Sequence, residues 1–199
     1  MADQSLKLNR RAVVSQLLRD RDEILLVTGL GAATWDVAAA GDNPLTFPLW
    51  GAMGGAAMVG FGLALAQPSR RVLVITGDGE MLMGIGSLAT IAVQRPRNLC
   101  IVVLDNERFG ETGQQRTHTA SGTDLAAVAL ACGFPQARTV RIENEIEELR
   151  SDIHKIDDLF LAVVKVALTD DPTALPPRDG AYLKNRMRAA ILGPDSTLR

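Results

Sequence analysis

Two short polar motifs follow two apolar, β-branched runs, and their residue types could hold a metal ion. Gly77-Asp78-Gly79 follows the run at 72–75, and Asp105-Asn106 follows the run at 101–104. Ligands of open α/β sheets bind just beyond the carboxyl ends of such buried strands. Asp78 offers an anionic oxygen, Asn106 an amide oxygen, and the glycines let backbone approach an anion. The two motifs therefore predict a diphosphate bound through Mg²⁺, which suits these oxygen ligands better than zinc does.

Taken alone, Gly77-Asp78-Gly79 also fits an ordinary turn, because Gly and Asp are common in turns. However, a spacer of 25 residues, from 80 to 104, separates it from the second motif. This arrangement resembles the signature of the thiamine-diphosphate-dependent enzymes, in which GDG is followed at about this distance by a paired Asn. The resemblance implies that Mg²⁺ is held by Asp78, Asn106 and the backbone carbonyl of Arg108, and that thiamine diphosphate is the cofactor. Asp105 stands where the family has Asn, at a position that does not hold the metal.

The resemblance extends upstream to the segment Trp50-Gly51-Ala52-Met53-Gly54. By composition alone this segment also fits a packed core turn. In the thiamine enzymes a similar segment carries a bulky apolar residue that bends the cofactor, and Met53 matches that residue. Gly51 matches the residue whose carbonyl accepts a hydrogen bond from the aminopyrimidine. The cofactor-binding residues predicted from the resemblance are Gly29, Leu30, Gly51, Met53, Gly77, Asp78, Gly79, Glu80, Asn106, Phe109 and Gly110.

Gly29-Leu30-Gly31 follows the first strand-like run and opens a helix-like stretch. Free backbone amides at a helix N-terminus can bind phosphate, although glycines after a strand are common for other reasons. The thiamine enzymes often have Ser or Thr in this turn, and this chain offers only Thr28 and Thr34 nearby. We therefore expect any diphosphate contact here to rest on backbone.

The stretch Phe109–Thr119 is polar and lacks clear periodicity, so it reads as a loop. It resembles the Tyr-Gly-Ser-Thr-Gly-x-Gln-x-Thr stretch of phosphonopyruvate decarboxylases and sulfopyruvate decarboxylase β subunits, with Phe109 in place of Tyr and Glu111 in place of Ser. Loops above a rigid sheet carry binding groups. The substrate contacts predicted in this loop are Glu111, Thr112, Gln114 and Arg116. Glu111 adds a negative charge where a dianionic substrate would approach, so the substrate could differ from theirs.

Two side chains of this loop have competing interpretations. His118 could shuttle protons at neutral pH as a catalytic residue, or it could be a solvated loop histidine. Arg116 could pair with a substrate carboxylate or a cofactor phosphate, or lie free at the surface.

The resemblance covers about residues 20 to 168 and only the diphosphate-binding half of a thiamine site. In that family a Glu on a separate pyrimidine-binding domain activates the cofactor, and the 199 residues leave no room for that domain. The resemblance therefore implies a separate α-type partner subunit that carries the Glu. It also implies a dimer of heterodimers or a larger assembly, and an isolated chain that is inactive. The region 54–65 and the tail helix at 179–192 are the expected contact regions.

The activity implied is decarboxylation of a small 2-oxo acid to an aldehyde, by a carboxy-lyase subunit resembling sulfopyruvate decarboxylase β subunits and phosphonopyruvate decarboxylases. Met53 and His118 are the candidate catalytic residues. A C–C lyase or carboligase subunit is one alternative, and a non-catalytic interaction subunit with the same fold is another. A nucleotide-binding oxidoreductase is disfavoured, because Thr34 stands where the dinucleotide fingerprint needs its third glycine.

Composition and charge restrict the other function classes. The formal net charge of −2 gives no general attraction to nucleic acid or anionic membranes, and neither is an expected partner. The N-terminus lacks a leader pattern, and no apolar run reaches membrane-spanning length. Cys100 and Cys132 form neither a disulfide framework nor a metal-ligand spacing. We therefore expect a cytoplasmic protein.

Alternating strand-like and helix-like segments predict an α/β fold, a three-layer doubly wound sandwich with a mostly parallel sheet, which is the thiamine-diphosphate-binding fold. The apolar helix expected from Gly54 to Gln67 should be buried, and a single helix should run from about Met81 to Val93. We expect a cofactor-binding domain over 1–169, a linker over 170–178, and a C-terminal helix and tail over 179–199. In the tail helix Tyr182, Met187 and Ile191 should pack.

Overall fold

The computed structural model describes residues 8–21, 23–155 and 157–198, and its centre is a six-stranded sheet in which every pair of neighbours is parallel. The strand order is β2-β1-β3-β4-β8-β7. The strands are β1 (Leu25–Thr28), β2 (Thr46–Pro48), β3 (Val72–Gly77), β4 (Leu99–Asp105), β7 (Gln136–Val140) and β8 (Phe160–Lys165). The predicted α/β class is confirmed, and the sheet is parallel throughout.

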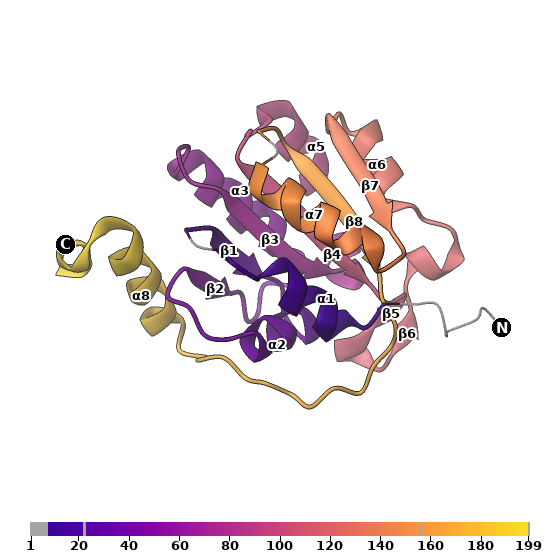
Figure 1. Ribbon diagram of the computed structural model, residues 1–199, viewed down its shortest axis with the longest axis horizontal. Helices are drawn as coiled ribbons and strands as arrows, with labels where there is room; N and C mark the ends of the chain where they lie inside the picture. Colours follow the sequence, from indigo (N-terminus) through magenta and orange to yellow (C-terminus); the bar gives the residue numbers. More distant parts are fainter. Residues whose placement is uncertain (1–7, 22, 156, 199) are drawn as a thin grey trace.

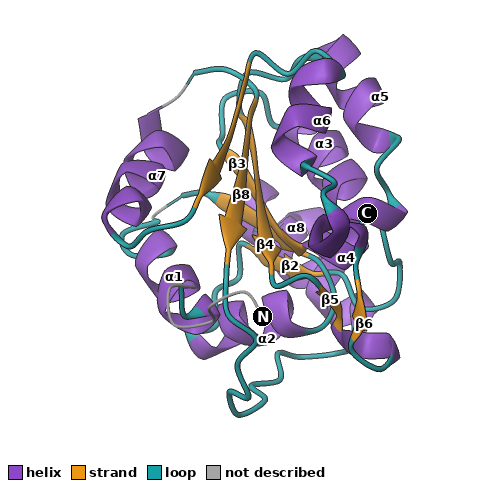
Figure 2. Cartoon of the chain, turned by 90° about the vertical axis from the view of Figure 1, so that its right-hand side faces the viewer, coloured by secondary structure: helices purple, strands orange, loops and turns teal. Residues whose placement is uncertain are grey.

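Helices cover both faces of this sheet, as the edge-on view of Figure 2 shows. On one side lie α1 (Arg10–Leu17), α2 (Ala32–Ala39) and α7 (Asn144–Lys155). On the other side lie α3 (Ala56–Ala66), α5 (Ser87–Gln94) and α6 (Leu125–Ala131). Strand β3 feeds both cores, because Val72 and Val74 face one side while Leu73 and Ile75 face the other. Burial on both faces explains why its sequence is continuously apolar.

The order of the strands defines where a ligand should bind. From β1 the chain moves outward to β2, and it then returns to the other side of β1 with β3 and continues to β4. The switch point therefore lies between β1 and β3, and ligands of doubly wound sheets bind beyond the carboxyl ends of the strands there. The turn after β1 and the GDG motif after β3 flank this point.

The helix expected from Met81 to Val93 is two helices, so that prediction was wrong. Helix α4 (Asp78–Met83) begins directly at the GDG motif, and α5 begins only at Ser87. Gly84 ends α4 because the backbone of Gly54 lies against it. A Cβ atom on Gly84 would be only 2.2 Å from the Gly54 carbonyl oxygen. Gly84 and Gly86 stand between the two helices, and the close approach of Gly54 leaves no room for a side chain at the first of them.

Helix α3 is buried on one side only, which corrects the expectation of a fully buried helix. Gly60 lies close against Val74 of β3, where a Cβ atom would be 2.2 Å from a valine methyl group. The opposite side leaves Met58, Val59 and Leu65 exposed by 37% or more. Its glycines therefore serve close packing on the sheet, while its apolar outer face has no cover within the described residues.

The segment after β4 has more structure than a loop. Strands β5 (Arg108–Phe109) and β6 (Gln115–Arg116) form a short antiparallel hairpin, with one 3₁₀ turn inside it (η2, Gly110–Thr112) and one after it (η3, His118–Ser121). Figure 1 shows this hairpin beside the ends of β3 and β4. The sequence did not predict this hairpin, because strands of two residues are too short to show an alternating apolar pattern.

The C-terminal helix α8 (Gly180–Leu192) lies beside the edge strand β2, and η4 (Pro194–Leu198) follows it (Figure 1). Asp179 caps α8, and Arg186 forms a 2.7 Å ion pair with Asp42. Leu183 and Met187 are buried, whereas Tyr182 is 51% exposed, so the packing role expected for Tyr182 was wrong.

The division into a domain over 1–169, a linker over 170–178 and a tail over 179–199 stays a prediction. Residues 1–7 and 199 lie outside the described part of the chain. Within that part, no helix is both long and apolar enough to cross a membrane.

Candidate functional site

The two predicted motifs meet at the carboxyl edge of the sheet, where one cavity opens. Strands β3 and β4 pair so that Gly77 lies opposite Leu104, which places Asp78 beside the end of β4. The cavity is lined by residues of the GDG motif, the turn after β1, the end of β4, the β5–β6 hairpin and helix α1. They are Arg10, Leu30, Gly31, Ala32, Ala33, Met53, Gly77, Asp78, Gly79, Glu80, Leu104, Asn106, Arg108, Phe109, Gly110, Glu111 and Thr112.

Asp78 is buried, with 1% of its surface exposed. Its Oδ2 accepts hydrogen bonds from the hydroxyls of Thr117, at 2.6 Å, and Thr119, at 3.3 Å. The pKa of Asp78 is raised from 3.8 to about 6, mainly by burial; the threonine hydrogen bonds oppose this rise, and the charge of Asp105 contributes to it. The ionised form of Asp78 is therefore costly until a cation reaches it.

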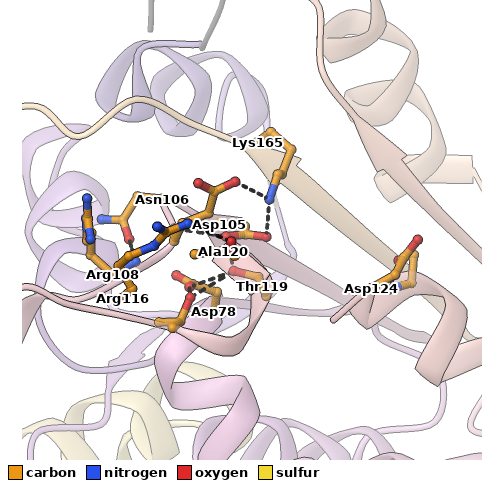
Figure 3. Close-up of polar contacts among 12 residues, drawn as sticks. Asp78, Asp105, Asn106, Arg108, Arg116, Thr119, Ala120, Asp124 and Lys165 are labelled. Atoms are coloured by element: carbon orange, nitrogen blue, oxygen red, sulfur yellow. Dashed lines mark hydrogen bonds and ion pairs between the residues drawn. The ribbon is translucent and has the colours of Figure 1, made fainter. Parts of the chain in front are cut away.

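Asp105, unlike Asp78, has a cationic partner among the described residues, which balances its negative charge. Its Oδ2 lies 2.8 Å from the ammonium of Lys165, which also pairs with Glu107 at 2.9 Å. Its Oδ1 accepts a 2.9 Å hydrogen bond from Thr119, so one threonine joins the two aspartates. Figure 3 shows Lys165, Thr119 and Asp78 connected in this way. Lys165 thus neutralises the second aspartate and leaves the charge of the first available.

These donors fit a magnesium ion. Within the described residues, Asp78 has no cationic partner, and no group of three His, Cys, Asp or Glu could hold a metal. Half-buried Asn106 and Arg108 line the same cavity as Asp78, and their amide and backbone carbonyl oxygens are the other predicted ligands. A hydrogen bond of 2.9 Å from the Arg108 amide to Asn106 Oδ1 fixes that side chain, and Glu107 completes the turn at a positive φ of 66°. One carboxylate, one amide and one carbonyl suit a hard cation that also keeps phosphate or water ligands.

Two of the backbone N–H groups after β1 that we expected to be free already donate hydrogen bonds within the protein. The N–H of Gly29 donates to the carbonyl of Ile75 at 2.9 Å, and the N–H of Leu30 donates to Glu80 at 3.1 Å. The expectation of free amides is therefore wrong for Gly29 and Leu30. The first N–H groups of α2 have no acceptor inside the helix, and its cap residue Gly31 supplies none. A phosphate at this turn would meet these helix amides instead.

Glu80 connects three segments around the cavity. Its carboxylate accepts hydrogen bonds from Thr76 at 2.9 Å and from the amides of Leu30 and Ala56. Burial is the main cause that raises the pKa of Glu80. It also fills the space beside Gly29, where a Cβ atom would lie 1.7 Å from Oε2. Glu80 lines the cavity, but its hydrogen bonds connect the segments that form the cavity walls, so its carboxylate is already occupied by protein groups.

Met53 lines the same cavity and is 40% exposed. Its position depends on the contact between Gly54, which has a φ of +84°, and Gly84. Gly51 is exposed and does not line the cavity. Trp50 turns the other way, because its indole Nε1 donates to the Pro177 carbonyl at 3.3 Å.

The predicted cofactor, substrate and catalytic residues of the hairpin and of the turn after it fall into two groups. Phe109, Gly110, Glu111 and Thr112 line the cavity together with Arg108, whereas Gln114, Arg116 and His118 are exposed outside it. The ring of Phe109 lies over Gly79, where a Cβ atom would be 2.6 Å from Cδ1. The guanidinium of Arg116 donates to the Ala120 carbonyl at 2.7 Å, which ties the hairpin to the turn after it. The His118 ring lies edge-on to Phe109 at 6.5 Å.

Sequence reasoning missed four side chains of this site. Arg10 comes from α1 and Lys165 from β8, whereas Thr117 and Thr119 lie in the polar segment after β4, in which other residues were the predicted contacts. The two threonines could have been suspected from their place beside the paired motif. Arg10 and Lys165 lie far along the chain, and only the strand order brings them here.

Comparison with known proteins gives a family match over most of the chain. Residues 29–164 match the family "Thiamine pyrophosphate enzyme, C-terminal TPP binding domain". Sulfopyruvate decarboxylase subunit beta of Methanocaldococcus jannaschii is 35% identical, over 66% of this chain and 69% of that protein. The corresponding subunit of Methanothermobacter thermautotrophicus is 40% identical, over 65% of this chain and 69% of that protein.

Longer relatives match over a smaller part of their length. Phosphonopyruvate decarboxylase of Streptomyces hygroscopicus is 39% identical, over 78% of this chain but 36% of that protein. Among solved structures, benzoylformate decarboxylase of Polynucleobacter necessarius superimposes with a TM-score of 0.69 at 19% identity, over 86% of this chain and 36% of that chain. The last comparison concerns the fold alone.

Proposed function

The chain belongs to the thiamine pyrophosphate enzymes, through their C-terminal cofactor-binding domain, and from that membership we propose that it is the cofactor-holding, β-type subunit of a decarboxylase. Its substrate is a small 2-oxo acid, which loses carbon dioxide and leaves as an aldehyde. The observation that carries this proposal is the buried carboxylate of Asp78, which faces a cavity beside Asn106 without a cationic partner in the described residues.

Mg²⁺ would be held by Asp78, by the amide oxygen of Asn106 and by the carbonyl of Arg108. When bound, thiamine diphosphate supplies the electron sink that decarboxylation needs and that no protein side chain offers. Met53 would contact the cofactor from the cavity wall, and Phe109, packed on Gly79, forms the cavity wall on the side of the hairpin. Glu111 and Thr112 are the hairpin residues that we assign to substrate contact, because they line the cavity.

A separate α-type subunit supplies the activating Glu, and the two chains assemble as a dimer of heterodimers or larger. The names of the archaeal relatives, subunit beta, support a partner of this kind. The uncovered apolar face of α3, with Met58, Val59 and Leu65, is the surface proposed to meet it. We also propose a cytoplasmic location, because both cysteines are free.

Calorimetric titration of the chain with thiamine diphosphate tests the proposal, with and without Mg²⁺. The wild-type chain should bind the cofactor only in the presence of Mg²⁺, and Asp78→Ala should abolish that binding. Asp124→Ala is a matched control, because Asp124 caps α6 and lies outside the cavity. Equal affinity of Asp78→Ala and wild type would refute the metal assignment. Decarboxylation of a 2-oxo acid by the isolated chain at an enzymatic rate would refute the split active site.

A further inference from the structure

Arg10 reaches the cavity from a part of the chain that no cofactor motif includes. It is the first residue of α1, whose N-cap Asn9 accepts a 2.8 Å hydrogen bond from Ala12. The start of this helix is fixed at the carboxyl edge of the sheet, because Leu8 forms a parallel bridge with Val166, directly after β8. The side chain of Arg10 therefore starts beside the carboxyl edge of the sheet, where the candidate site lies.

Arg10 belongs to a buried cluster with an excess of positive charge. It is 5% exposed, and its Nε pairs with Asp36, which is fully buried. Arg11 also pairs with Asp36, through Nε at 3.0 Å, from the more exposed side. Two guanidinium groups thus share one carboxylate, and a buried cluster with a surplus charge is costly unless an anion joins it.

The remaining nitrogens of Arg10 point to where that anion would lie. Nη1 and Nη2 have no acceptor among the described residues, and Arg10 lines the cavity together with Gly31, Ala32 and Ala33. These three residues form the start of α2, where N–H groups and the helix dipole favour an anion. The exposed Glu111 carboxylate already lies against Gly31 from the hairpin side.

We propose that Arg10, which lines the same cavity as Asp78, binds one phosphate of the cofactor diphosphate together with the first amides of α2. This inference rests on the proposed function. Asp36 orients the guanidinium by holding Nε, which leaves the two terminal nitrogens for a forked contact to phosphate oxygens. Mg²⁺ neutralises part of the diphosphate charge, and Arg10 neutralises part of the remainder.

Isothermal titration of the full chain with inorganic diphosphate and Mg²⁺, and then with thiamine diphosphate, tests this role. Arg10→Gln should weaken both ligands roughly 10- to 100-fold, the range expected for a hydrogen-bonded contact between charged groups. Arg10→Lys keeps the charge but loses the fork, so it should fall between Arg10→Gln and wild type. Arg11→Gln is the matched control, because Arg11 holds the same aspartate but does not line the cavity, and it should stay within about threefold of wild type.

A second pair of variants covers the case in which Arg10→Gln destabilises the fold by leaving Asp36 without its partner. Asp36→Asn should keep diphosphate affinity, and the double variant Asp36→Asn, Arg10→Gln should lose it by the same factor as above. The role of Arg10 is overturned if Asp36→Asn and the double variant bind diphosphate equally well, or if Arg10→Gln binds it as well as wild type does. The proposed function would stand in either case. A wild-type chain that binds neither ligand overturns both proposals.

Discussion

The hydroxyl of Thr117 donates a 2.6 Å hydrogen bond to the carboxylate of Asp78. This contact joins residues 39 positions apart and makes the polar loop part of the proposed metal site. It also opposes the rise in the pKa of Asp78 that burial causes. The loop therefore favours the ionised form of Asp78, which is the form that binds a cation.

Removal of this hydroxyl should weaken cofactor binding. Thr117→Val keeps the side-chain shape but leaves Asp78 with the longer side-chain hydrogen bond from Thr119. Hydrogen bonds to charged groups are worth about 1.5–3 kcal/mol, so the affinity for thiamine diphosphate with Mg²⁺ should fall roughly 10- to 100-fold. Thr117→Ser, which keeps the hydroxyl, should stay near wild type. Calorimetric titration checks this, and an unchanged affinity of the valine variant would contradict it.

The stability of the metal-free chain should decrease as the pH rises from about 4 to about 6. The native pKa of Asp78 is raised from 3.8 to about 6, so the native state holds this proton more tightly than the unfolded state does. The contribution is therefore complete below the unfolded pKa and is lost as the pH rises through the native one, and it amounts to about 3 kcal/mol. Urea unfolding of wild type and Asp78→Asn at pH 4 and 7 measures it. Identical pH slopes in the two proteins would count against it.

Binding of thiamine diphosphate through Mg²⁺ should show the opposite dependence. Mg²⁺ needs the ionised carboxylate, so affinity should fall about tenfold for each pH unit below about 6. Above that pH the Asp78 contribution should be constant. Titrations between pH 5 and 8 in wild type and in Thr117→Val test this, and the midpoint of the variant should be higher because a hydrogen bond that lowers the pKa is gone.

The contact between Gly54 and Gly84 should tolerate no side chain. In Gly84→Ala the new methyl group would meet the Gly54 carbonyl oxygen at 2.2 Å, so backbone must shift. We expect a loss of about 2–4 kcal/mol in the free energy of unfolding. Gly86→Ala is the control, because nothing lies within 4 Å of its Cβ position and it should cost little. Thermal and urea unfolding compare the two, and equal stabilities would show that the contact is less tight.

Met53 should matter for the cofactor and little for the fold. It is 40% exposed in the cavity, while Met58, 39% exposed, lies on the outer face of α3. Contact with the cofactor would bury the part of Met53 that is still exposed, about two fifths of the 1.5–3 kcal/mol that full burial of such a side chain contributes, or roughly 0.6–1.2 kcal/mol. Met53→Ala should therefore weaken thiamine diphosphate binding roughly 3- to 8-fold, whereas Met58→Ala should leave its affinity unchanged. Similar affinities of the two variants would remove Met53 from the cofactor contact.

The fold could be predicted from the sequence to a large extent. Continuous β-branched runs such as Val72–Ile75 fit only strands buried on both faces, and their alternation with helical segments gives a parallel sheet. Because the carboxyl ends of such strands lie along one edge, the GDG motif and Asp105-Asn106 had to be neighbours. The helix boundaries failed where tertiary contact acts, as at Gly84.

For this chain, the sequence alone determined the class of the fold and the family, because these depend on local patterns and on the spacing of motifs, and it predicted Asp78 and Asn106 as a metal-binding pair. Tertiary structure decided which side chains complete the site. Thr117 and Lys165 converge on the two aspartates, Glu80 occupies the amide of Leu30, and Arg10 enters from α1. Such contacts depend on strand order, loop path and side-chain direction together, and no local periodicity records them.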